Sequence, residues 1–376
     1  MKRASFCSLV CLLLGYGAVV FGGTTKPTSR PSSRHIKFSP KGKKRPLVIG
    51  HRGLSGWYPE HTLGAYRAAM RRGADFIEPD LVMTKDGVLI ARHENDITHT
   101  TNVAKKFPKR KRTKLIDGVK VTGYFTEDFT FREIRRLYAV QRLPFRNQRL
   151  NKRYRVPSLR EILKLVQKMS KLTGRPIGVY PETKHPTYFA SIKLPMERKL
   201  IMELERADFL HKPGRLFVQS FEVGNLKKLH KMVHDLPLIQ LLYTPKYQPY
   251  DLRLKKSRVT YGDMATPKGL KQIATYAKGI GVPKSMIVPI KGGKRLPPTT
   301  LLSNAHRAGL LVHAYTFRNE KRFLGKAWKT PVEEYQYFYR LGIDGVFSDF
   351  PDLAYIVRER MWRIGREKGL PLFAPR

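Results

Sequence analysis

LVIGHRGLSGWYPEHTLGAYRAAMRRGADFIEPDLVMTKDGVLIARHEN, residues 47–95, contains three short apolar runs, and each run ends abruptly at polar or charged side chains. Buried strands are built from such apolar runs, but they do not need the groups that follow them here. Those groups are therefore candidate catalytic or metal-binding residues. In chain order they are His51 and Arg52, then Glu78 and Asp80, then His93.

The second run places two carboxylates side by side. Side chains alternate between the two faces of a strand, so Phe76, Glu78 and Asp80 share one face. Like charges held this close inside a fold are costly unless a cation neutralises them or one of them takes up a proton. Because carboxylate oxygens are the ligands of hard divalent cations, the pattern predicts a metal site.

The chain begins with a candidate export signal. Lys2 and Arg3 precede an apolar run over residues 4–21, which ends at small residues. This order predicts a signal peptide at residues 1–23, cut between residues 18 and 24, followed by a polar tether at residues 24–45. The alternative is an uncleaved membrane anchor, because the run is almost long enough to span a bilayer. With cleavage, the protein is expected to be periplasmic or secreted.

Both cysteines, Cys7 and Cys11, lie inside this leader. The mature chain is therefore expected to contain no cysteine. That excludes a disulfide framework as well as a thiolate metal site or nucleophile.

The charge balance is strongly basic. Lys and Arg number 73 against 29 Asp and Glu, for a formal net charge of +44. Such a charge attracts phosphate esters, acidic lipid head groups, envelope polymers or nucleic acid, although a merely solvated basic surface is an equal alternative. The basic runs match no nucleic-acid-binding module, so we expect no specific nucleic-acid partner. The run at 105–120 predicts peripheral contact with an anionic membrane or an envelope polymer.

Candidate strands and helices alternate along the rest of the chain. Most of eight candidate strands are followed by a helical pattern, which predicts an α/β fold of the TIM (β/α)8 barrel type over residues 46–357. The basic residues of about 96–156 form an insertion after the second strand. Residues 358–376 form a basic C-terminal tail, which is either a last barrel helix or a peripheral basic flap. The candidate strands are 47–50, 75–82, 177–182, 216–221, 238–243, 286–290, 310–315 and 345–348.

Polar residues recur where these strands end. Active sites of such barrels lie at the C-terminal ends of the strands, so we expect these side chains to surround one mouth. They are His51, Glu78, Asp80, Glu182, Gln219 and Tyr315.

Several ordered motifs resemble one known family. They are HRG (51–53), PEHT (59–62), GADFIEPD (73–80), TKDG (84–87), PETK (181–184), QSF (219–221), VHAYT (312–316) and DGVFSDFP (344–351). Together with His93 they resemble the glycerophosphodiester phosphodiesterase family over essentially all of residues 46–357. The insertion resembles that of the secreted, periplasmic branch. Two positions depart from the family pattern: Glu94 stands where an aspartate is usual and His99 where an arginine is usual.

The resemblance implies hydrolysis of glycerophosphodiesters to sn-glycerol 3-phosphate and an alcohol. It implies one divalent cation, Ca²⁺ first and Mg²⁺ as the alternative, held by Glu78, Asp80 and Glu182. It also implies that His51 and His93 are the general acid and base, which suits histidine chemistry near neutral pH. The family's route begins with attack by the adjacent glycerol hydroxyl and passes through a cyclic phosphate. The sequence does not assign acid and base between the two histidines.

Other residues at the expected mouth are candidates for binding substrate. Arg52 and Lys184 are placed to hold phosphate oxygens, or else to form structural ion pairs with the acids. Glu60 is expected to contact the metal or the glycerol, with a helix N-terminal carboxylate as the alternative. Gln219, Phe221 and Tyr315 are expected pocket walls, although core packing would suit them almost as well.

Two other functions fit the pattern less well. One is a related phosphodiesterase acting on intact lipids, of the lysophospholipase D or sphingomyelinase D type. The other is a non-catalytic barrel whose basic surface binds polyanions. A small-molecule phosphodiester is the substrate that we expect.

Overall fold

The computed structural model describes residues 45–368. The expected signal peptide lies outside them, as do residues 24–44 of the expected tether and the last eight residues of the expected tail. Within residues 45–368, no helix combines the length and the apolar character needed to cross a membrane.

Eight strand positions close into a ring. Parallel pairing runs from one strand to the next, and the last strand pairs with the first through Leu47 opposite Gly345, so the expected TIM barrel is confirmed. Two of the eight barrel strands are each divided into two short strands, and the first of these is interrupted at Pro79. The strands are β1 (Leu47–His51), β2 (Phe76–Glu78) with β3 (Asp80–Met83), β7 (Gly178–Val179) with β8 (Glu182–Thr183), β9 (Val218–Ser220), β10 (Leu238–Leu241), β11 (Gly279–Pro283), β14 (Leu311–Phe317) and β15 (Gly345–Ser348).

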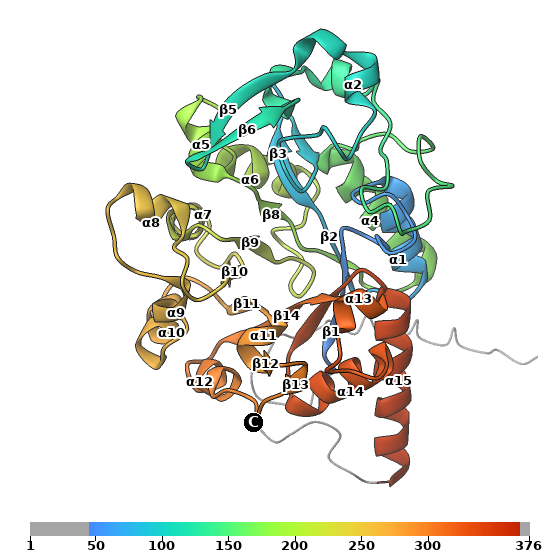
Figure 1. Ribbon diagram of the computed structural model, residues 1–376, viewed down its shortest axis with the longest axis vertical. Coiled ribbons are helices and arrows are strands. Elements are labelled where there is room, and N and C mark those ends of the chain that lie inside the picture. The colour runs from blue at the N-terminus through green and yellow to red at the C-terminus, as the bar shows by residue number, and fades with distance from the viewer. Residues whose placement is uncertain (1–44, 369–376) are drawn as a thin grey trace, which may run out of the picture. The chain divides into compact units, whose positions relative to one another are not determined.

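Helices follow the strands and surround the ring (Figure 1). Several begin where the sequence supplies a cap; Ser158, for example, forms a capping box with Glu161 at the start of α4. The longer helices are α1 (Leu63–Arg71), α4 (Leu159–Thr173), α6 (Glu197–Arg206), α7 (Val223–Met232), α10 (Pro267–Ile273), α12 (Leu301–Arg307), α14 (Pro331–Leu341) and α15 (Pro351–Lys368). The shorter ones are α5 (Pro186–Ser191), α8 (Tyr250–Leu254), α9 (Tyr261–Met264), α11 (Lys284–Ile287) and α13 (Lys321–Leu324).

One expected strand is wrong. We expected the sixth strand at 286–290, but β11 lies at Gly279–Pro283. Most of 286–290 belongs to α11 and to the short hairpin of β12 (Ile290–Lys291) and β13 (Lys294–Arg295). The glycines of β11 are required by close packing. A Cβ on Gly281 would lie 2.4 Å from Leu241 Cδ2.

The expected boundary between barrel and tail, after residue 357, falls inside a helix. Helix α15 continues through residue 358 to Lys368. Arg358 is 4% exposed and forms an ion pair with Asp75, and its Nη1 also donates to the carbonyl of Pro46. The first part of the expected tail is therefore a barrel helix anchored beside β1.

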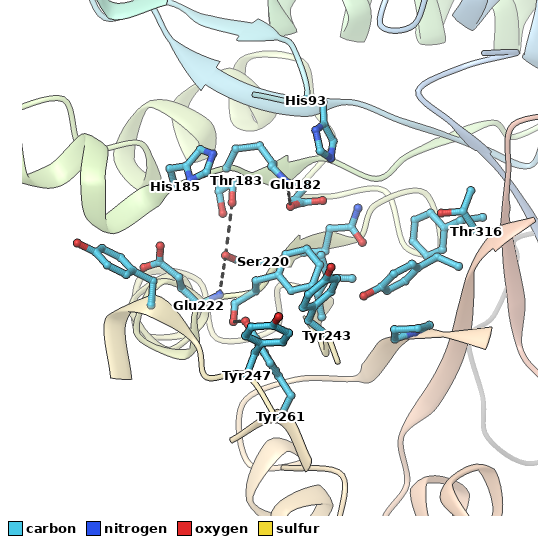
Figure 2. A pocket seen from close by; sticks show the side chains of 18 of the residues that line it. His93, Glu182, Thr183, His185, Ser220, Glu222, Tyr243, Tyr247, Tyr261 and Thr316 are labelled. Atoms are coloured by element: carbon cyan, nitrogen blue, oxygen red, sulfur yellow. Dashed lines mark hydrogen bonds and ion pairs between the residues drawn. The ribbon is translucent and has the colours of Figure 1, made fainter. Parts of the chain in front are cut away.

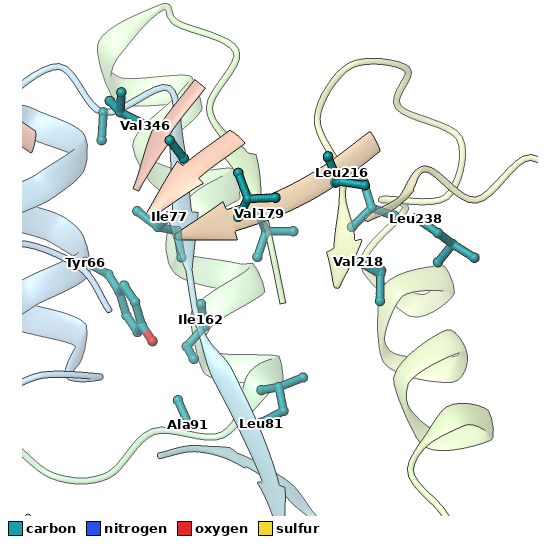
Figure 3. Close-up of a cluster of buried hydrophobic side chains, with 14 of the residues drawn as sticks. Tyr66, Ile77, Leu81, Ala91, Ile162, Val179, Leu216, Val218, Leu238 and Val346 are labelled. Atoms are coloured by element: carbon teal, nitrogen blue, oxygen red, sulfur yellow. The ribbon is translucent and has the colours of Figure 1, made fainter. Parts of the chain in front are cut away.

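The barrel has two apolar clusters on the two sides of its strands. The alternation along β2 is confirmed, because Phe76 belongs to one cluster and Ile77 to the other. Figure 3 shows part of the larger cluster, with Ile77, Val179 and Val346 on strands and Ile162 on helix α4. Inside the ring lie Ile49, Phe76, Tyr180, Phe217, Ile239 and Phe347.

The insertion carries a β-hairpin that reaches the mouth. After β3 the chain turns at residues 84–88, where the Asp86-Gly87 pair suits a tight turn, into the antiparallel β4 (Leu89–Ala91). The insertion then forms α2 (Val103–Lys106), η1 (Pro108–Arg110), β5 (Arg112–Ile116), β6 (Val119–Gly123), η2 (Thr126–Asp128) and α3 (Phe131–Ile134). At the β5–β6 turn, the carbonyl of Asp117 accepts a hydrogen bond from Arg253 of α8.

Candidate active site

A cavity of about 830 Å³ lies at the C-terminal ends of the barrel strands. Most of the residues expected at the site line it, and Figure 2 shows His93 and Glu182 close to one another in its wall. Asp80 and Glu60 are not among the lining residues. Those that line it are His51, Arg52, Glu78, His93, Glu182, Lys184, Gln219, Phe221 and Tyr315.

The three expected metal ligands meet. Glu78, Asp80 and Glu182 each offer a carboxylate oxygen, and these three atoms lie within 4.8 Å of one another. Strand register explains this, because Asp80 pairs with Glu182 across β3 and β8. All three side chains are buried, and residues 45–368 contain no other cluster of three or more acidic, histidine or cysteine side chains with this spacing.

Neighbouring cations balance only part of the charge of these three acids. Burial and the neighbouring charges of Asp80 and Glu182 hold the pKa of Glu78 well above its ordinary value. Burial also raises the pKa of Glu182, with Asp80 adding to the effect. Gln219 donates from Nε2 to Glu78 Oε1 at 3.2 Å, while its own buried Oε1 has no hydrogen-bond partner among the described residues. These oxygens fit a hard divalent cation.

Arg52 lies against the acids. Its backbone occupies the left-handed region at φ 59°, and its N–H donates to Glu78 Oε2 at 2.9 Å. The guanidinium lies 3.3 Å from Asp80 Oδ2 and 3.2 Å from Glu60 Oε2. Burial alone would lower its pKa, but the surrounding carboxylates raise it. Arg52 is therefore a fixed cation in the cavity wall.

Lys184 supplies a second cation. Its Nζ lies 2.9 Å from Glu182 Oε1 and 5.6 Å from the centre of the Phe221 ring. Burial opposes the charge, but Glu182 and Asp80 outweigh it and raise the pKa. Lys184 and Arg52 thus face the same cavity from β8 and from the end of β1.

Glu60 pairs with two arginines and is not among the residues that line the cavity. Its Oε2 accepts hydrogen bonds from Arg52 at 3.2 Å and from Arg142 of the insertion at 2.9 Å. Burial would raise its pKa, but the two guanidinium groups lower it. Glu60 therefore orients two arginines of the cavity wall and stands behind them.

His51 is held by a carboxylate. Its Nδ1 lies 2.5 Å from Asp349 Oδ1, which assigns the Nδ1 proton to this bond and leaves Nε2 without a partner among residues 45–368. Burial and the charge of Arg52 lower the pKa of His51 to about 4. Asp349 also pairs with Arg146 and Arg318.

His93 is held in a similar way. Its Nδ1 lies 2.8 Å from Glu94 Oε1, and Glu94 Oε2 lies 2.8 Å from His185 Nε2. Glu94 therefore supplies the support at the position where the family pattern usually has aspartate. Burial and the charges of Arg52 and Lys184 lower the pKa of His93.

The remaining expected wall residues line the same cavity. Phe221 packs edge-to-face against Tyr315, with ring centres 6.4 Å apart. The Tyr315 hydroxyl donates to the carbonyl of Leu242 at 2.5 Å. Both rings are partly buried, so they contribute to packing as well as to the cavity wall.

The sequence and the structure match one family in three comparisons. Residues 51–353 match the model of the glycerophosphoryl diester phosphodiesterase family. The chain belongs to this family. It is 35% identical to the Arabidopsis thaliana glycerophosphodiester phosphodiesterase GDPD6 over 92% of this chain and 95% of that protein. It is 30% identical to a Haemophilus influenzae glycerophosphodiester phosphodiesterase over 82% of this chain and 89% of that protein.

A solved structure agrees in fold. It is an Oleispira antarctica phosphodiesterase in complex with the product sn-glycerol-3-phosphate. The TM-score is 0.50 at 17% identity, over 84% of this chain and 97% of that one. As a member of the family, the protein is an enzyme of the phosphodiesterase class.

Sequence reasoning missed several supports of this family site. His61 binds Asp80 Oδ2 through Nε2 at 2.8 Å and Tyr66 through Nδ1 at 2.8 Å. Asp349 follows β15, so the rule that placed the other residues at strand ends could have found it. Arg142 comes from the insertion, where no motif marks it.

Proposed function

We propose that this enzyme hydrolyses glycerophosphodiesters to sn-glycerol 3-phosphate and an alcohol, with a divalent cation, Ca²⁺ before Mg²⁺, held by Glu78, Asp80 and Glu182. One observation carries the proposal. The three carboxylates lie within 4.8 Å of one another beside a cavity that His51 and His93 also line. The family membership and the relatives' names support the same reaction.

Substrate binding rests on the cations of the wall. A phosphodiester carries one negative charge, and Arg52 and Lys184 present a planar fork and a point charge to it. Both are held in place by carboxylates, so little ordering is needed when the phosphate binds. The bound cation would supply Lewis-acid neutralisation of the phosphoryl oxygens.

The two histidines move the protons. One Nε2 takes the proton from the glycerol hydroxyl next to the phosphate, whose oxygen then forms the new bond to phosphorus. The other imidazole gives a proton to the departing alkoxide, which leaves as the alcohol. Water opens the resulting cyclic phosphate with the histidine roles reversed. A lowered pKa suits the histidine that accepts the first proton, because that imidazole must start neutral. The histidine that gives a proton to the alkoxide must start protonated.

Incubation of the purified enzyme with glycerophosphocholine tests the proposal. Ca²⁺ should give sn-glycerol 3-phosphate and choline, chelation should stop the reaction, and His51→Asn or His93→Asn should lower kcat by about a hundredfold or more. Arg307→Gln, on the far end of the barrel, serves as the matched surface control. Absence of product from the calcium-loaded wild type would remove the proposed function.

We also propose that the protein is exported and contacts an anionic surface through its insertion. The leader pattern supports export. The tip of the β5–β6 hairpin exposes Leu115 and Val119, at 64% and 61%, among basic residues near the cavity mouth. Apolar tips ringed by lysine and arginine favour anionic lipid surfaces. N-terminal sequencing of the secreted protein tests the cleavage, and salt-sensitive binding to vesicles rich in anionic lipid tests the contact.

A further inference from the structure

The cavity, at about 830 Å³, is larger than a glycerol phosphate requires, and aromatic rings line one part of it. Away from Thr316, the wall carries Tyr243, Tyr247 and Tyr261, which Figure 2 shows below Ser220. The ring centres of Tyr243 and Tyr247 lie 5.7 Å apart, and Phe221 packs edge-to-face on Tyr243 at 6.3 Å. Tyr243 and Tyr247 are each about half exposed, so much of their ring surface has no protein contact.

Glu222 stands in the same wall, two residues beyond the end of β9. Only 4% of the residue is exposed, and its carboxylate accepts a hydrogen bond from the Thr187 hydroxyl. Glu222 has no ion pair with any residue of 45–368. This sets it apart from Glu60, Asp80 and Glu182, each of which has a cationic partner.

A second buried acid increases the negative charge behind this wall. Asp251 is 5% exposed, and its Oδ2 accepts from the backbone N–H of Gly224 at 2.6 Å. Its Oδ1 has no hydrogen-bond partner within the described part of the chain. Burial, with Asp251 adding to it, raises the pKa of Glu222 to about 8. A cation in the cavity would therefore stabilise the charged carboxylate.

The protein's own cations near this wall have other partners. Lys246 lies 5.4 Å from the Tyr247 ring centre, and Arg253 lies 5.1 Å from that of Tyr250 while donating to the carbonyl of Asp117. A metal is not the fitting ligand either, because Glu222 and Asp251 do not form a compact metal-binding group. Aromatic faces beside one carboxylate are instead the usual environment of an organic ammonium group.

We propose that Glu222, together with Tyr243, Tyr247 and Tyr261, binds the ammonium end of the substrate's alcohol. The proposal rests on the proposed function and narrows it to diesters of cationic amino alcohols. A trimethylammonium group, as in choline, fits better than a primary amine, since it needs ring faces and a counter-charge but no hydrogen-bond acceptors. In a chain of net charge +44, a cationic group needs such a local acid to be attracted at all.

Glu222→Gln tests this with two substrates that share the glycerophosphate and differ in the alcohol. For glycerophosphocholine we expect KM to rise about tenfold with kcat nearly unchanged, and for neutral glycerophosphoglycerol we expect less than about a twofold change. Tyr243→Leu and Tyr247→Leu should also raise the KM for glycerophosphocholine relative to the KM for glycerophosphoglycerol. Asp235→Asn is the control, because Asp235 is fully exposed and precedes β10 at the other end of the barrel.

Binding of tetramethylammonium, followed by saturation-transfer NMR, gives a readout that does not depend on turnover. The wild type and Asp235→Asn should bind it, and Glu222→Gln should bind it at least about fivefold more weakly. Unchanged selectivity in all three site variants, or equal tetramethylammonium binding by wild type and Glu222→Gln, would overturn the subsite. If the wild type cleaves neither diester, the proposed function fails, while the ammonium binding still decides the subsite.

Discussion

Asp349 Oδ1 lies 2.5 Å from Nδ1 of His51, at the place where the last barrel strand meets the first. The pair joins the first and the last strand of the barrel, and its two residues are 298 positions apart in the chain. Its carboxylate holds the imidazole with Nε2 free for the substrate. This arrangement has a direct consequence for catalysis.

Asp349→Asn should lower kcat by about a hundredfold or more, because an amide can stabilise the wrong tautomer of His51 and cannot stabilise its protonated form. KM should change much less. Steady-state kinetics over a range of pH checks this, together with a thermal melt, since Asp349 also pairs with Arg146. Asp352→Asn, whose partner Arg72 is largely exposed, is the control. Wild-type kcat in a folded Asp349→Asn protein would show that the pair plays no part in catalysis.

Glu182→Gln should weaken Ca²⁺ binding by at least about a hundredfold, because one of three charged ligands is lost. Calorimetric titration of the metal-free protein measures it directly. Ca²⁺ should also raise the Tm of the wild type but not that of the variant. Glu205→Gln, an exposed carboxylate outside the cavity, should bind Ca²⁺ like the wild type. Equal affinity in both variants would contradict the metal assignment.

Glu60→Gln should cost about 3 kcal/mol of unfolding free energy, because it leaves the buried Arg52 without one of its counter-charges. Urea denaturation checks this. The matched control is Glu203→Gln, which breaks the exposed pair with Arg160 and should cost no more than about 1 kcal/mol. Similar losses of unfolding free energy in the two variants would mean that burial of the Glu60–Arg52 pair adds nothing to stability. We also expect KM to rise severalfold, because Arg52 would no longer be held.

Stability should fall as pH rises from about 6.5 to about 9. Asp117 and Glu94 outweigh burial and raise the pKa of His185 to about 9, above its ordinary 6.5. The folded state therefore holds this proton more tightly than the unfolded state, so its contribution is complete below 6.5 and lost as pH passes 9. Urea midpoints measured at intervals across that window test the slope.

His185→Gln should flatten that slope. His211→Gln should not, because His211 is exposed and its pairing with Glu205 is at the surface. An unchanged slope in His185→Gln would assign the pH dependence to another group.

The sequence by itself determined the barrel and most of its mouth. Alternating apolar runs and helical patterns predicted seven of the eight strand positions. Polar residues in or directly after the candidate strands 47–50, 75–82 and 177–182 predicted the acids and His51. This works because parallel strands in a ring all end at one mouth, so the order of residues along each strand fixes which side chains reach it. The sixth strand was missed because Gly279 and Gly281 carry no side chain to show a pattern, and only the packing of Leu241 and Leu311 explains them.

The tertiary structure decided which partners each of these groups has. Glu60 was expected to contact metal or glycerol, but it binds Arg52 and an arginine of the insertion, 82 residues away. Glu222 directly follows the candidate strand at 216–221, but only the structure shows that this carboxylate is buried in the cavity wall. Strand patterns are local and repeat with period two, whereas ion pairs and cavity walls join distant segments whose meeting depends on the closed barrel.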